Sequence, residues 1–137
     1  MTESRWTAIS DTGRDAYLET VVTVDGRPVD EVVAEFGSFW VVTAWNPFSE
    51  ELAPDENARR HAELLARLEA DGLVWLPAVG SSPDGQWAEE SMAVVGIDRE
   101  TARALGRDFD QHAVFEVADG ILRAHACFDD WIDERPL

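Results

Sequence analysis

Phe39-Trp40-Val41-Val42-Thr43-Ala44-Trp45-Asn46-Pro47 is the stretch of sequence from which the fold of this chain can be predicted. The residues from Phe39 to Thr43 are all aromatic or β-branched, which is typical of a strand covered on both faces. The strand must end at Asn46-Pro47, because proline has no amide hydrogen and disfavours helical backbone in the residue before it. The stretch therefore predicts a buried central strand followed by a sharp turn.

Further helices and strands can be predicted from hydrophobic periodicity and from turn residues. One helix is expected from Pro28 to a stop at Gly37, and a longer one from Pro54 or Asp55 to Asp71-Gly72. A third is expected over residues 99–107, with Asp98 as its N-cap. The other expected strands span residues 17–24, 73–79, 87–96 and 111–117, and a return strand pairs with the last of these.

The register of the last hairpin can be predicted by counting residues outward from its turn. If Asp119-Gly120 is a two-residue type I′ turn, Val117 faces Leu122, Phe115 faces Ala124 and Ala113 faces Ala126. Glu116 then faces Arg123 on the opposite side of the hairpin, as a pair of opposite charges. This register separates apolar from polar pairs, as a strand pair with one buried face requires.

From Phe39 onward the expected order is strand, helix, strand, strand, helix, strand. This βαββαβ order predicts an α+β fold, namely a ferredoxin-like split sandwich with a mostly antiparallel sheet. A strand and a short helix are expected to be added at the N-terminal side, and a hairpin strand at the C-terminal side. Residues 1–137 are predicted to form a single domain with its core over about 36–126.

The two ends of the chain are predicted to lie outside this core. Residues 1–15 are polar and are interpreted as a loosely held lead-in, with Trp6 and Ile9 as its anchors. Residues 128–137 are interpreted as an acidic tail that contacts the body through Trp131 and Ile132.

The chain is strongly acidic, with 28 Asp and Glu residues against 11 Lys and Arg and a net charge of −17. This charge argues against binding to nucleic acids or anionic membranes, because both need a basic surface. Two interpretations of the charge stay open. It can serve solubility or adaptation to salt, or it can mark an acidic decoy that meets a basic protein partner.

Cys127 is the only cysteine, so no intramolecular disulfide can form. The sequence shows no hydrophobic leader and no apolar run of membrane length, so we expect a cytoplasmic protein.

Several polar residues are expected to meet at one edge of the predicted sheet. The strand directions place the end of the first strand, the start of the long helix and the starts of the third and fourth strands at that edge. A helix start with free amides favours an anion or a nucleotide-like ligand there. The expected ligand-binding residues are Asn46, Asn57, Arg60, Trp87, Glu89, Ser91 and Gln111.

Individual roles can be assigned within this set, and each has a structural alternative. Arg60 is expected to pair with Glu89 as a charge-balanced clamp, and Trp87 to offer a face for a ring. Asn46 can equally serve only as a turn residue before proline, and Gln111 as a solvated strand end.

The segments Thr43-Ala44-Trp45-Asn46-Pro47, Glu56-Asn57, Trp87-x-Glu89-x-Ser91 and Phe109-x-Gln111-x-Ala113-Val114-Phe115 together resemble a bacterial domain-of-unknown-function family, DUF3293. The resemblance covers about residues 36 to 117 and implies a compact stand-alone domain without an assigned activity. The chain departs from the family pattern at Asp110, where a glycine is more usual.

Known chemistries find little support in the sequence. No phosphate-binding glycine loop is present, and the three histidines do not show zinc-site spacing. His112 would face Cys127 across the hairpin, which at most offers two ligands for a weak metal site. Glu89 and Glu90 point to opposite faces, and Ser91 has no histidine partner, so no metal or cofactor is predicted and the sequence assigns no catalytic residue.

Two classes of function are therefore expected. The first is a binding or regulatory domain for a small anionic ligand at the sheet edge. The second is an acidic interaction module of the inhibitor, immunity or nucleic-acid-mimic type, whose partner is a basic protein.

Overall fold

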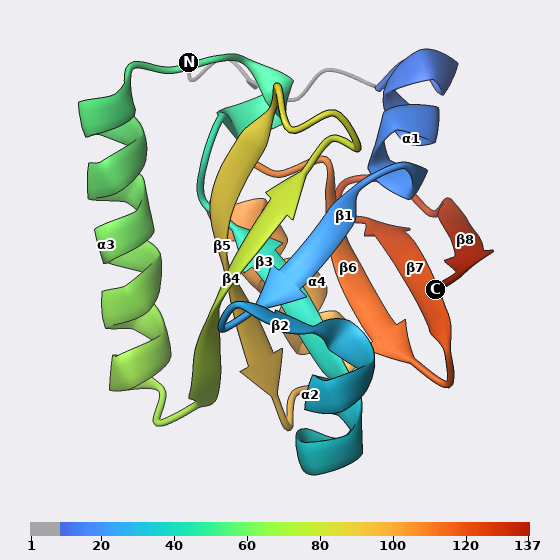
Figure 1. The fold of residues 1–137 in the computed structure, drawn as a ribbon. Coiled ribbons are helices and arrows are strands. Elements are labelled where there is room, and N and C mark those ends of the chain that lie inside the picture. Colours follow the sequence, from blue (N-terminus) through green and yellow to red (C-terminus); the bar gives the residue numbers. More distant parts are fainter. Residues whose placement is uncertain (1–8) are drawn as a thin grey trace.

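The computed structural model describes residues 9–137, which contain α-helices on both faces of one large β-sheet (Figure 1). The elements in chain order are α1 (Asp11–Leu18), β1 (Val21–Val24), β2 (Arg27–Pro28), α2 (Val29–Phe36), β3 (Phe39–Thr43), the 3-10 helix η1 (Pro47–Ser49), α3 (Pro54–Ala70), β4 (Val74–Ser81), β5 (Ala88–Val95), α4 (Arg99–Asp108), β6 (Ala113–Ala118), β7 (Ile121–Ala126) and β8 (Ile132–Pro136).

The sheet has eight strands in the order β2-β1-β4-β5-β3-β6-β7-β8, and every neighbouring pair is antiparallel. Strand β3 lies inside the sheet between β5 and β6, as its apolar sequence predicted. The α+β class and the antiparallel sheet predicted from the sequence are confirmed, and the sheet is larger than the predicted sandwich.

The side chains of β3 alternate between two hydrophobic cores. Trp40 and Val42 pack against Leu64 and Leu68 of α3 and Leu105 of α4, on one face of the sheet. Phe39 and Val41 face the other side, where Val32 of α2 and Tyr17 of α1 pack. This double burial is why β3 has no polar residue before Thr43.

The hairpin of β6 and β7 has the register that the turn arithmetic predicted. Val117 pairs with Leu122, Phe115 with Ala124, Ala113 with Ala126 and Glu116 with Arg123. Both turn residues have left-handed backbone, with φ of 54° at Asp119 and 74° at Gly120, as a type I′ turn requires.

The capping residue predicted for the third helix is also confirmed. The Asp98 side chain accepts a hydrogen bond from the Thr101 amide at 2.8 Å. This bond satisfies one of the free amides in the first turn of α4.

The prediction of a strand over residues 17–24 is wrong in its first half, because Tyr17 belongs to helix α1 and the strand starts at Val21. Ser10 caps α1 by accepting a hydrogen bond from the Gly13 amide at 3.1 Å. The interpretation of residues 1–15 as a lead-in thus misses a helix that begins at Asp11. Trp6, one of its expected anchors, lies outside the described residues.

The C-terminal segment is a strand rather than a tail. Residues of β8 pair with β7 from Ile121↔Pro136 to His125↔Ile132. Trp131 packs against the core on the α1 side, as expected, whereas Ile132 stays 44% exposed. The strand continues the sheet by one more antiparallel pair.

Candidate functional site

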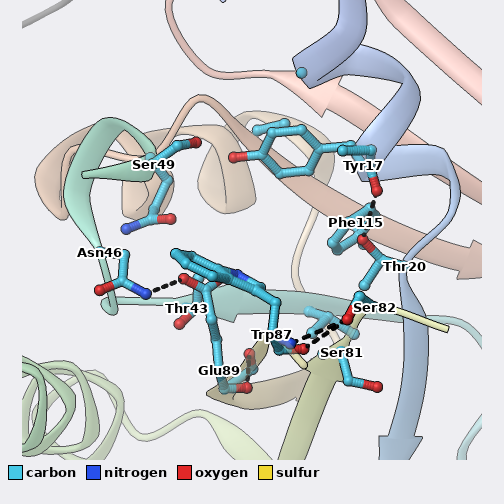
Figure 2. A pocket seen from close by; sticks show the side chains of 17 residues that line it. Tyr17, Thr20, Thr43, Asn46, Ser49, Ser81, Ser82, Trp87, Glu89 and Phe115 are labelled. Carbon is cyan, nitrogen blue, oxygen red and sulfur yellow. Dashed lines mark hydrogen bonds between the residues drawn. The ribbon is translucent and has the colours of Figure 1, made fainter. Parts of the chain in front are cut away.

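A cavity of about 330 Å³ lies between α1 and the sheet (Figure 2). Its walls come from α1, from β3 and the loop after it, from the ends of β4 and β5, and from the start of β6. It is lined by Gly13, Ala16, Tyr17, Thr20, Val41, Thr43, Asn46, Ser49, Gly80, Ser81, Ser82, Trp87, Glu89, Ser91, Gln111, Ala113 and Phe115. Its size is within the range of small-molecule sites.

The structure brings together most of the residues that the sequence placed at one sheet edge. Asn46, Trp87, Glu89, Ser91 and Gln111 all line the cavity. They come from separate segments that meet only because β5 and β6 flank β3.

Asn46 is the most highly connected of these residues, and it is only 5% exposed. Its Oδ1 accepts hydrogen bonds from the Asn57 Nδ2 at 2.9 Å and from the Leu52 amide at 3.0 Å. Its own amide donates to Asn57 Oδ1 at 2.9 Å. Because φ is 47°, the backbone is left-handed, a conformation that asparagine tolerates better than most residues. Asn46 therefore joins the end of β3 to the first turn of α3.

The loop after Asn46 holds further strained backbone. Phe48 has φ of 49° and Ser49 has φ of 63°, and the Phe48 amide donates to the Asp110 carbonyl at 2.7 Å. The Phe48 ring meets the His112 ring edge-on at 5.3 Å. Strain of this kind costs free energy and persists only where the surrounding contacts fix it.

Glu89 supplies the acidic group of the cavity. Its Oε2 accepts a hydrogen bond from Asn46 Nδ2 at 2.8 Å, drawn as a dashed line in Figure 2. Burial is the largest influence on this carboxyl and raises its pKa above the ordinary value, while hydrogen bonds from Asn46 and Trp87 oppose the rise.

Gln111 is held by the backbone around it and is 3% exposed. Its Nε2 donates to the carbonyls of Trp45 at 3.0 Å and Phe109 at 3.1 Å. Asp110, just before it, has φ of 58°, in the left-handed region that favours glycine. Asp110 therefore adopts a backbone conformation that a glycine would reach without steric cost.

Tyr17 forms the wall on the α1 side, and the sequence gave no indication of this role because the residue was assigned to a strand. Its ring lies 5.6 Å from the Phe115 ring, and Figure 2 shows the hydroxyl directed across the cavity toward Ser49. Burial and the nearby Glu89 raise the pKa of the Tyr17 hydroxyl. Tyr17 is therefore neutral over the ordinary pH range.

Trp87 and Ser91 lie on the same strand face as Glu89. Trp87 is 40% exposed at the rim, which leaves part of its ring accessible. Ser91 is 4% exposed, and its hydroxyl donates to the Glu89 carbonyl at 3.3 Å. The alternation predicted for this strand thus directs these residues into one cavity.

The expected pairing of Arg60 with Glu89 is wrong. Arg60 Nε donates to the Ala44 carbonyl at 2.6 Å and Nη2 donates to the Phe109 carbonyl at 2.5 Å. The side chain is 16% exposed and does not line the cavity. Arg60 joins α3 to the end of β3 and the end of α4, so its role is structural.

Asn57 also stays out of the cavity. It is 3% exposed and uses its side chain on Asn46 and on the Leu52 carbonyl. It supports Asn46 from behind and has no surface left for a ligand.

Helix α1 is held over the cavity by the C-terminal strand. Arg14 donates to both carboxylate oxygens of Asp133, at 2.9 and 2.7 Å, and its guanidinium lies 4.7 Å from the Trp131 ring centre. Arg135 donates to the Leu18 carbonyl and, at 2.7 Å, to the Thr20 carbonyl. None of the α1 residues is fully buried, so these polar contacts carry much of its attachment.

The lining residues that the sequence did not predict come from α1 and the segment just after it, from the end of β3 and η1, and from the end of β4. Ser10 followed by Gly13 and Arg14 was a usable helix signal, since Ser is a preferred N-cap. The missed polar lining residues are Tyr17, Thr20, Thr43, Ser49, Ser81 and Ser82.

In the described part of the chain, no group of three or more His, Cys, Asp or Glu side chains is placed so that it could hold a metal ion. Cys127, expected to face His112, donates its amide to the His112 carbonyl at 2.9 Å. Burial raises the pKa of the Cys127 thiol to about 12, which disfavours the thiolate that metals bind.

Within residues 9–137, none of the helices has both the length and the apolar character needed to cross a bilayer.

Comparison with known proteins identifies a family for this chain. Neither the curated proteins nor the solved structures contain a match to this chain. A family model described as protein of unknown function matches residues 42–114, a span that contains Asn46, Glu89 and Gln111 but not α1. Since this span is more than half of the chain, the protein belongs to the DUF3293 family.

Proposed function

We propose that this protein is a binding domain for a small molecule, which occupies the cavity beneath α1. The observation that carries the proposal is the cavity itself, in which hydrogen-bonded polar groups of Asn46, Glu89 and Gln111 lie among aromatic side chains. An apolar pocket with a few fixed polar groups is the common form of a ligand site.

The strained loop after β3 supports a functional role for this cavity. Asn46, Phe48 and Ser49 all have left-handed backbone, and two of them line the cavity. Backbone strain concentrates at ligand sites, where it fixes groups in the geometry that binding needs.

The anionic ligand expected from the sequence depended on Arg60. Because Arg60 binds two backbone carbonyls outside the cavity, and Glu89 is the charged residue in the lining, we propose a ligand without an anionic group at the Glu89 end. A phosphate or carboxylate placed there would meet a like charge.

We infer that the central part of the chain is a ferredoxin-like unit. The order β4-β5-β3-β6 is the one that a βαββαβ split sandwich takes, and α3 and α4 contact the same core. We also propose a cytoplasmic location, supported by the single buried Cys127.

A thermal-shift screen of small metabolites tests the binding proposal. A compound that binds only the folded protein, at about 100 times its Kd, should raise the Tm by about 5 °C or more. Ala16→Phe, which places a ring in the lining from α1, should abolish the shift. Thr12→Phe is the control, because Thr12 is an exposed α1 residue outside the lining.

Two outcomes would contradict the proposal. Compounds that shift both variants equally would bind elsewhere. A screen without any shift, together with salt-sensitive capture of a basic protein, would favour the acidic interaction module, because charge-steered association weakens as salt rises.

A further inference from the structure

The described lining of the cavity carries only negative charge. Glu89 and Tyr17 are the titratable residues of the lining, and no arginine or histidine belongs to it. Glu89 also has no ion pair with any residue in the described range 9–137. Among the described residues the carboxylate therefore has hydrogen bonds but no counter-ion.

An ionised carboxylate in such a setting is incompletely stabilised. Its Oε2 accepts a hydrogen bond from the side-chain Nδ2 of Asn46 at 2.8 Å. Burial still outweighs the hydrogen bonds and disfavours the charged form of the carboxyl group. A cation brought in by a ligand would supply the opposite charge that residues 9–137 do not place beside Glu89, because a buried charge is stable only when it is paired.

Gln111 offers a second acceptor at the site. Gln111 uses Nε2 on two backbone carbonyls, so Oε1 has no donor among the described residues. A ligand group with several N–H bonds is suited to a site where a carboxylate and an amide oxygen can both accept. A primary ammonium has three such donors.

Aromatic side chains also line this polar end. Tyr17 and Phe115 lie with their ring centres 5.6 Å apart, and Figure 2 shows the Trp87 ring below Tyr17 and next to the Glu89 side chain. Aromatic faces attract both planar rings and cations. A carboxylate beside such faces is a favourable combination for an ammonium group linked to a ring.

We propose that the ligand is a small arylalkylamine, whose protonated amino group binds the Glu89 carboxylate and whose ring packs against Trp87, Tyr17 and Phe115. This inference rests on the proposed function, because it assigns a ligand class to the same cavity. It differs from the sequence-based expectation in the sign of the ligand's charge.

Three probes that differ only at the polar end of a phenylalkyl group test the ligand class: 2-phenylethylamine, 2-phenylethanol and 3-phenylpropanoate. Each is titrated into ¹⁵N-labelled protein, with the amide signals of Glu89, Ser91 and Gln111 as the readout. We expect the amine to bind at least about tenfold more tightly than the alcohol, because a hydrogen bond between charged groups contributes a binding free energy of this size. The acid should bind more weakly than the alcohol, because its charge repels Glu89.

Variants separate the charge from the shape of the site. Glu89→Gln keeps the side-chain shape and should reduce amine affinity about tenfold or more while leaving the alcohol unchanged. Glu90→Gln is the matched control, since Glu90 is exposed on the same strand and lies outside the cavity lining. Unchanged spectra of the free variants establish that both are folded.

The outcomes distinguish the two proposals. If the alcohol or the acid binds at these amides as tightly as the amine, or if Glu89→Gln keeps the preference for the amine, the ligand class is wrong while the cavity remains a binding site. If none of the three probes shifts these amides, the arylalkylamine proposal is overturned, whereas the proposed function is decided separately by the metabolite screen and the Ala16→Phe variant.

Discussion

Asn46 Nδ2 lies 2.8 Å from Glu89 Oε2, and this hydrogen bond links the turn after β3 to the neighbouring strand β5. The same asparagine side chain accepts from the Leu52 amide and from Asn57. One residue thus fixes the acidic group of the cavity and the entry into α3. This explains why a polar side chain is kept at a buried position of the sequence.

Asn46→Gly should destabilise the fold by about 2–4 kcal/mol, because it leaves several buried polar partners without their hydrogen bonds. Glycine keeps the left-handed backbone, so this variant isolates the side chain. Asn46→Ala should cost about 1 kcal/mol more, through backbone strain. Urea denaturation measures both values. A loss below about 0.5 kcal/mol for Asn46→Gly, the size of an ordinary surface change, would mean that the network contributes little.

The pKa of Glu89 should be above the ordinary value for a glutamate, since burial outweighs its hydrogen bonds. The groups that face it are the neutral Asn46, Trp87 and Tyr17. The folded state therefore binds the proton more tightly than the unfolded chain, and this group lowers stability as pH rises from about 4.3 through the raised pKa. Glu89→Gln should be more stable than the natural protein at neutral pH, and the difference should shrink in acid.

Carboxyl-detected NMR titration measures the pKa directly. In Asn46→Gly the pKa of Glu89 should rise further, because the Asn46 hydrogen bond lowers it. A Glu89 pKa at or below the ordinary range in the natural protein would contradict this view of the cavity, and so would a Glu89→Gln variant that is less stable at neutral pH.

Local sequence signals were sufficient for much of the fold. The Asp119-Gly120 turn determined the register of the β6–β7 hairpin, because a two-residue turn leaves one pairing that keeps apolar residues on one face. The apolar run of β3 likewise placed it inside the sheet. These features depend on a few neighbouring residues, which is why they can be predicted.

Other features depend on contacts between distant segments. Helix α1 has no buried residue and is held largely by Arg14, Trp131 and Arg135, so its own sequence carries only a weak helix pattern. Strand β8 alternates exposed and half-buried residues at the sheet edge, which resembles a solvated tail. For this reason the predicted site did not include the residues of α1 that line the cavity.

Arg60→Ala should destabilise the fold by about 2–3 kcal/mol, because it leaves the carbonyls of Ala44 and Phe109 without charged donors. The helical spacing of the sequence places Arg60 in the N-terminal half of α3 but does not show which carbonyls its side chain reaches. Arg59→Ala is the control, since Arg59 is exposed and should change stability by less than about 0.5 kcal/mol. Equal effects in denaturation experiments would contradict the structural role of Arg60.

Gly106 allows α4 to approach the sheet closely where β6 begins. A methyl group added at this position would overlap Cys127 Sγ and lie 2.8 Å from Val114 Cγ1. The Gly106 carbonyl accepts a hydrogen bond from the Gln111 amide at 2.9 Å, so the same approach positions a cavity residue.

Gly106→Ala should therefore destabilise the fold by about 1–3 kcal/mol through overpacking and shift the Gln111 amide signal in NMR spectra. Removing the sulfur with Cys127→Ala creates room on one side, so the double variant should be more stable than the sum of the two single effects predicts. The relief should be partial, because Val114 still lies in the way. If the two effects add strictly in a double-mutant cycle measured by denaturant unfolding, the absence of a side chain at Gly106 does not serve to make room for Cys127.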